Sequence, residues 1–198
     1  MRHSSPVPFD DVDPRVSRSR AAVIRAATDL LVEGGPSAVT VDSIVHRSGV
    51  AKSTIYRHWQ SRDEILLSVI ESCAPAIPMP DPDVDVVDAM RQVVHAMADA
   101  LNDPEWARVL PALLMLKNHE SGIAAMNDKL EHEQEMALNV LLERASSEGV
   151  LRADLDTQEA ATMLVGPLLF AHLTDSVKLD EAFVDRAVDN FLKAYAPS

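Results

Sequence analysis

Residues 40–59, TVDSIVHRSGVAKSTIYRHW, combine two short segments of helical periodicity with a glycine between them. Thr40 has the residue type favoured at a helix N-cap, and Gly49 can adopt the positive φ that a tight turn between helices needs. In the second segment Ile55 and Trp59 are four residues apart, so they share one helix face. The pattern predicts two helices joined by a glycine turn, the second beginning at Lys52.

The outer side of that second helix carries small polar, basic and aromatic residues: Lys52, Ser53, Thr54, Tyr56 and Arg57. A helix whose exposed beginning bears such side chains can enter a DNA groove, while its apolar face packs on its own domain. The segment therefore indicates a helix-turn-helix DNA reader. A plain surface role for Arg57 is the alternative, and Tyr56 can combine a packed ring with an exposed hydroxyl.

The charge distribution supports this interpretation, although the formal net charge of the chain is -13. Residues 14–62 contain eight Lys/Arg and three Asp/Glu, a balance of +5, whereas residues 71–198 contain nine Lys/Arg and 23 Asp/Glu, a balance of -14. DNA is a polyanion, so a cationic head on an acidic body places the positive field where a duplex would be contacted.

Around the reader the sequence predicts a division of the chain into three parts. Residues 1–14 form a disordered arm, residues 15–73 the DNA-binding domain, and residues 84–198 a helical body. We expect Ser17 to cap the first helix and Ser61 to cap a fourth helix. The intervening residues 74–83, APAIPMPDPD, hold four prolines, so no helix crosses them.

The body contains further amphipathic or apolar segments of helical length and no segment with a strand period. The predicted helical segments cover residues 84–101, 103 onward, 122–147, 156–174 and 179–195. The fold class is therefore all-α, with about nine helices.

Residues 20–66 resemble the N-terminal domain of the tetracycline-repressor (TetR) family of bacterial regulators. The matching positions are Ala26-Ala27, Gly35, Thr40, Gly49-Val50, Lys52, Thr54, Tyr56, Trp59 and Arg62. Two positions depart from the family pattern: Trp59 replaces the commoner phenylalanine, and Ala51 stands where a serine often caps the third helix. The second departure predicts that one capping or phosphate hydrogen bond is missing.

The resemblance implies roles for particular residues of the reader. Lys52, Ser53, Thr54 and Arg57 would face the major groove, and Arg can recognise guanine in bidentate fashion. Thr40, Tyr56, His58 and Arg62 would hold phosphates. The partner would be double-stranded DNA with a palindromic operator sequence, and the outcome transcriptional regulation, most simply repression.

The resemblance also implies a homodimer that an unidentified small molecule releases from DNA. Residues 164–170, LVGPLLF, look like those of family members that pair through their last two helices. The residues expected at the dimer interface are Leu164, Leu168, Ala171, Phe183, Val188 and Phe191. Methionine adapts to varied shapes, so an effector pocket is expected beside Met90, Met97, Met115, Met126 and Met163, with simple core filling as the alternative.

Other chemistry is not indicated. The chain lacks a P-loop, a dinucleotide fingerprint and a supported catalytic triad, so we expect no enzyme, no cofactor and no metal site. Asp128 and His132 are four residues apart but better explained as a solvated acidic face, and the single Cys73 excludes an internal disulfide. No membrane span or signal segment is apparent, which predicts a cytoplasmic, nucleoid-associated protein. The alternative function is a helical small-molecule-binding or enzyme-like protein with a vestigial reader.

Overall fold

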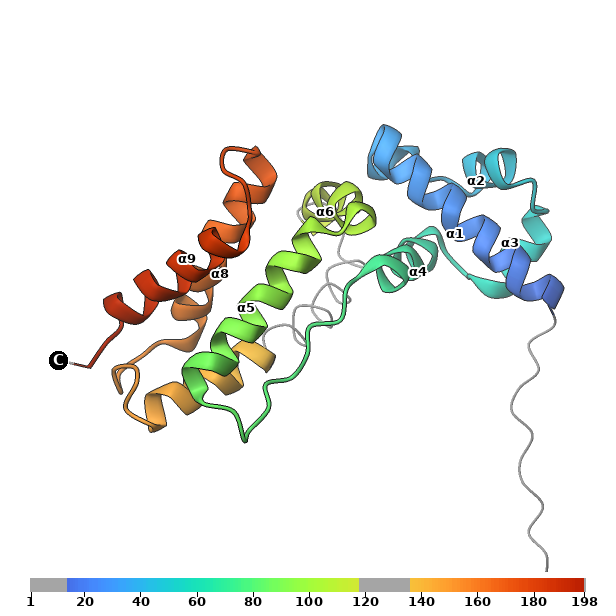
Figure 1. Cartoon of the computed structure of the whole chain (residues 1–198). Coiled ribbons are helices and arrows are strands. Elements are labelled where there is room, and N and C mark those ends of the chain that lie inside the picture. The colour runs from blue at the N-terminus through green and yellow to red at the C-terminus, as the bar shows by residue number, and fades with distance from the viewer. Residues whose placement is uncertain (1–13, 118–135, 198) are drawn as a thin grey trace, which may run out of the picture. The chain divides into compact units, whose positions relative to one another are not determined.

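The computed structural model describes residues 14–117 and 136–197, and among these residues there are helices and connections but no β-strand. The chain divides into two compact units, Met1–Ser72 and Cys73–Ser198. Figure 1 shows the helices of both units in chain order. The predicted all-α fold is confirmed. In the described part of the chain, no helix combines the length and the apolar character that crossing a membrane requires.

The first unit is built from α1 (Pro14–Gly34), the short 3₁₀ helix η1 (Pro36–Ala38), α2 (Val41–Ser48), α3 (Lys52–His58) and α4 (Arg62–Cys73). Helix α1 reaches back to Pro14, so Ser17 lies inside the helix and its predicted role as N-cap is wrong. Proline is well suited to the first helical position because its φ is already helical and its missing N–H would have no partner there. Ser61 does cap α4, since its Oγ accepts from the Glu64 N–H at 3.2 Å.

The core of this unit is the intersection of α1, α2 and α3, which pack on one another. The buried side chains at this intersection include Val23, Ala27, Leu31, Ile44, Ile55 and Trp59. The side chains that periodicity assigned to the inside of α3, Ile55 and Trp59, are 1% and 4% exposed. Burial of one face of so short a helix holds it in place, because seven residues are too few for a helix to be stable alone.

The second unit contains α5 (Val86–Asn102), α6 (Pro104–Lys117), a helix over residues 136–147, α8 (Thr157–Thr174) and α9 (Glu181–Ala194). Helices α5, α8 and α9 pack against each other around a continuous apolar core. Aspartate side chains accept backbone N–H bonds at the N-caps of these three helices: Asp85, Asp156 and Asp180. Each cap satisfies donors that a helix cannot pair internally and places negative charge at the positive end of the dipole.

Polar contacts tie α5 to α9 at the edge of that core. The Arg91 guanidinium contacts Asp185 and Asp189, and His95 Nε2 lies 3.0 Å from the Asp185 carboxylate. The hydrogen bond with His95, helped by the charges of His95 and Arg91, lowers the pKa of Asp185 below its ordinary value. These charge-assisted bonds connect α5 and α9 at the edge of the core.

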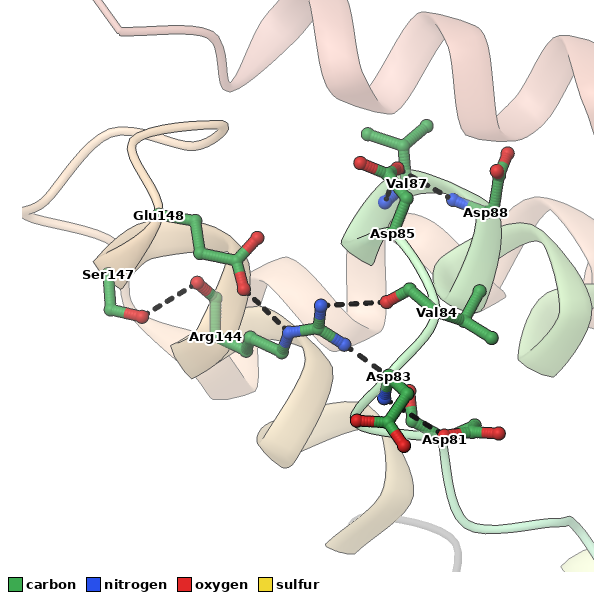
Figure 2. Close-up of polar contacts among 9 residues, drawn as sticks. All are labelled: Asp81, Asp83, Val84, Asp85, Val87, Asp88, Arg144, Ser147 and Glu148. Carbon is green, nitrogen blue, oxygen red and sulfur yellow. Dashed lines mark hydrogen bonds and ion pairs between the residues drawn. The ribbon is translucent and has the colours of Figure 1, made fainter.

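The connection that precedes α5 has no helix, as its prolines predict, and Arg144 anchors its end (Figure 2). The Arg144 guanidinium donates to the Val84 carbonyl at 2.7 Å and to the Asp81 carbonyl at 3.4 Å, while its Nε donates to Glu148 at 2.6 Å. One arginine on the 136–147 helix thus satisfies carbonyls that have no partner in a regular element.

Candidate nucleic-acid interface

The reader begins at the N-terminus of α2. Thr40 has an extended backbone (φ -117°), and its Oγ1 accepts from the Ser43 N–H at 3.1 Å, so the predicted N-cap is confirmed. The Thr40 residue is exposed at this helix N-terminus. This arrangement is a ready anion site, because the N–H groups and the helix dipole both favour negative charge.

The turn between α2 and α3 depends on Gly49, which ends α2 in the left-handed region with φ +69°. Its N–H donates to the Val45 carbonyl at 3.0 Å, closing the last turn of the helix. The predicted positive φ is confirmed. No atom lies within 4 Å of a Cβ built at this position, so a substitution is opposed by backbone strain rather than by a clash.

Replacing Gly49 by alanine is expected to lower the free energy of unfolding by about 1–2 kcal/mol, the cost of a left-handed L-residue. Asparagine tolerates that region better, so Gly49→Asn should lose clearly less than Gly49→Ala. Chemical denaturation followed by circular dichroism measures both. Equal losses for the two variants would contradict the backbone explanation.

Helix α3 exposes its first turn and buries its opposite face. Its N-cap is Ala51, which makes no side-chain capping bond, as the departure from the family pattern predicts. Lys52, Ser53, Tyr56 and Arg57 are exposed, and the Tyr56 side chain in particular is 49% exposed despite its aromatic ring. An aromatic residue that remains half in water on a short helix is available to a partner.

The lysine at the start of α3 forms an ion pair with an aspartate of α2. The Lys52 ammonium lies 2.7 Å from a carboxylate oxygen of Asp42 in the first turn of α2. That hydrogen bond raises the pKa of Lys52 above its ordinary value, so the lysine is charged at neutral pH. The pair is exposed and adds little to stability. The pair connects the start of α3 to the first turn of α2.

The end of α3 is fixed by Trp59 in ways that the sequence pattern does not reveal. The indole N–H donates to Ser68 Oγ on α4 at 2.9 Å, and the Arg20 guanidinium from α1 lies 5.8 Å from the ring centroid. The structure gives Arg20 a cation–π contact inside the reader. His58, expected at a phosphate, packs edge-on against the same indole.

Arg62, another expected phosphate contact, lies at the first turn of α4 and points back into the reader. Its Nε donates to the Val39 carbonyl at 2.8 Å and an Nη donates to the Pro36 carbonyl at 2.6 Å. These partners are 23 and 26 residues away in sequence, so no local sequence pattern predicts the two hydrogen bonds.

Comparisons with known families agree with this geometry. Residues 23–69 match the model of the bacterial regulatory proteins of the tetR family, and residues 80–191, more than half of the chain, match the tetracyclin repressor-like C-terminal domain. The chain belongs to the TetR family. The resemblance of residues 20–66 is thereby confirmed, and the protein is a helix-turn-helix transcriptional regulator.

Individual relatives resemble the TetR-family chain over most of its length. The uncharacterized HTH-type transcriptional regulator YdeS of Bacillus subtilis strain 168 is 28% identical in an alignment of 189 positions, which covers 91% of each chain. Among solved structures, the flavonoid-responsive regulator FrrA superposes with a TM-score of 0.69 at 24% identity, covering 90% of this chain and 97% of that one. The SmeT–triclosan complex gives a TM-score of 0.70 at 21% identity, with 90% and 91% covered. These two structures support the fold.

Of the five methionines expected beside an effector pocket, the structure describes the side chains of Met90, Met97 and Met163, and these differ widely in burial. Met90 and Met97 are 0% and 7% exposed and belong to the core of the second unit, whereas Met163 is 57% exposed on α8. Met115 lies in α6, and Met126 lies outside the described residues. Core packing is therefore the better explanation for the first two, since methionine spacing reports burial and not an open cavity.

The expected dimer residues also need correction. Leu164, Leu168, Ala171 and Val188 are at most 3% exposed and lie in the apolar interior of their own chain, so they cannot meet a second copy in this conformation. Phe183 and Phe191 instead line a groove of about 450 Å³ on α8 and α9, together with Met163 and Tyr195. Helix α8 is apolar around most of its circumference, and such a sequence does not reveal which face packs inward.

Metal binding has no support within residues 14–117 and 136–197, where no three His, Cys, Asp or Glu side chains converge. The Asp128–His132 pair lies outside the described residues.

Proposed function

We propose that this TetR-family regulator is a homodimeric repressor that binds a palindromic operator and is released from it by a small molecule. The observation that carries the DNA-binding part is the exposed first turn of α3, whose polar and cationic residues stand opposite the buried Ile55 and Trp59. Two such helices in one dimer would enter successive major grooves about 34–36 Å apart.

Within each reader the contacts divide by chemistry. Lys52, Ser53, Thr54 and Arg57 would read base edges, the arginine by its bidentate fork. Thr40, Tyr56 and His58 would hold phosphates from the two ends of the turn. The exposure of Thr40 and Tyr56 supports these roles, and so does the position of Thr40 at a helix N-terminus.

The dimer interface would lie on the outward side of α8 and α9. Three apolar side chains of α8 and one just after it are exposed: Met163 (57%), Phe170 (66%), Leu173 (44%) and Val177 (48%). The groove between α8 and α9 continues this apolar surface. Exposed apolar side chains in such number indicate a partner, and a self-complementary patch suits a two-fold homodimer.

The effector would be a small, largely apolar molecule that binds the second unit. FrrA is described as flavonoid-responsive and SmeT has been solved with triclosan, and both superpose on this chain over most of its length. To weaken operator binding about 100-fold, the ligand must prefer the released conformation by about 2.7 kcal/mol.

Selection of duplexes from a random-sequence library by the full-length protein tests the function. We expect an enriched palindrome, bound by two chains per duplex, with an affinity that falls steeply as salt is raised. A scrambled duplex of the same length is the control. Failure to enrich any sequence would refute the proposal and favour a helical binding protein with a vestigial reader.

A further inference from the structure

Arg62 joins two parts of the reader that are distant in sequence. It is the first residue of α4, and it donates hydrogen bonds to the carbonyls of Pro36 and Val39, in the link between α1 and α2. The arginine side chain is 26% exposed, so most of it lies inside the unit. We call these three residues the Arg62 clamp.

The clamp acts on the segment that determines where α2 begins. Val39 is fully buried and directly precedes Thr40, the N-cap of α2. The Pro36 carbonyl closes η1 by accepting from the Val39 N–H at 3.2 Å, and it accepts from Arg62 as well. Buried carbonyls in such a link need donors, and bonds from a charged donor are the strong ones.

We infer that Arg62 is a positioning residue, which holds the N-terminus of α2 and its Thr40 cap at a fixed place relative to α4. The inference rests on the proposed DNA-binding function. The guanidinium works through the Pro36–Val39 link and not by touching the duplex. A helix N-terminus binds phosphate well only if it is held where the phosphate lies, and small displacements of a positioned group are costly.

The chemistry of the clamp requires arginine rather than any cation. Its planar fork offers several N–H groups at fixed angles and can reach two carbonyls at once. A lysine at the same position keeps the positive charge, but its N–H groups all come from a single nitrogen at the end of a flexible chain. The two roles considered for this residue, phosphate contact and clamp, therefore make opposite predictions for Arg62→Lys.

The test measures the affinity of the full-length protein for the duplex that the wild type selects from a random library. We expect Arg62→Ala and Arg62→Lys to lose about 10-fold in affinity, the equivalent of one charge-assisted hydrogen bond. Both should keep the wild-type slope of log affinity against log salt, because the N–H groups of a helix N-terminus hold a phosphate without a cation. Arg47→Ala, which removes an exposed α2 arginine paired with Glu33, is the matched control and should stay near wild type.

Stoichiometric titration at protein concentrations far above Kd measures the active fraction and separates positioning from partial unfolding. Positioning predicts an unchanged active fraction with a weaker Kd, and Arg62→Lys serves if Arg62→Ala does not fold. The inference is overturned if Arg62→Lys binds like wild type while Arg62→Ala has a slope of log affinity against log salt that is shallower by about 0.9. That change is the one expected for the loss of a single phosphate contact. The inference is also overturned if only the active fraction falls, or if neither variant changes. If the wild type itself selects no duplex, the proposed function fails first.

Discussion

Phe170→Glu should convert the protein into a folded monomer, whereas Leu168→Glu should unfold the second unit. The two residues are neighbours on α8, yet the first is 66% exposed and the second is fully buried. A charge at Phe170 would be solvated in the monomer, but it would have to enter the proposed apolar dimer interface when two chains associate. A charge at Leu168 would not be accessible to solvent in the folded chain. The free-energy cost of burying an unpaired charge exceeds the free energy of unfolding of a typical domain.

Light scattering gives the mass of each variant, and thermal unfolding gives its stability. Val140→Glu is the control, because Val140 is a 44% exposed apolar residue on the 136–147 helix and its replacement should leave a stable dimer. A Phe170→Glu protein that remains dimeric at micromolar concentration would place the interface elsewhere. The milder Leu168→Ala should still destabilise by about 2–5 kcal/mol.

Arg57→Ala should weaken binding to the selected duplex by about 1–3 kcal/mol and relax the preference at one base position. Arg57 is exposed on α3 beside Tyr56, so its removal should leave the fold unchanged. Arginine makes two hydrogen bonds to guanine, and both are lost in Arg57→Ala. Duplexes with another base at that position never had these two bonds, so their affinity should fall less than that of the guanine duplex. This response differs from that of the Arg62 clamp, where the preferred base should stay the same.

Competition between the selected duplex and its single-base variants measures this preference. Arg47→Ala, on α2 and paired with Glu33, controls for the loss of one positive charge. A variant that loses affinity equally for all duplexes would show that Arg57 contacts the backbone. Unchanged affinity would identify it as a solvated surface arginine.

Much of the reader could be predicted because its determinants are local. The cap at Thr40, the turn at Gly49 and the burial of Ile55 and Trp59 each depend on residues within one or two helical turns. Periodicity, capping preference and the conformational freedom of glycine act over that range.

The misassigned residues share a different cause. Leu164 and Leu168 were expected at a surface between two chains, and they lie inside one chain because α8 packs on α5 and α9. The apolar residues of α8 are distributed nearly uniformly around the helix. The pattern therefore predicts that the helix is buried, but it does not distinguish the face that packs on its own chain from the face that would contact another chain. Met90 and Met163 likewise look alike in sequence, although one is buried and the other is 57% exposed.

The sequence by itself determined the fold class, the family and the face that α3 turns outward, because each follows from short-range order along the chain. Only the tertiary structure decided which side of α8 is free and what Arg62 holds. The partners of Arg62 lie 23 and 26 residues away, and the neighbours of α8 come from both sides of it in the chain. Contacts of that range depend on how all the helices pack together. They therefore cannot be predicted from the sequence of any single segment.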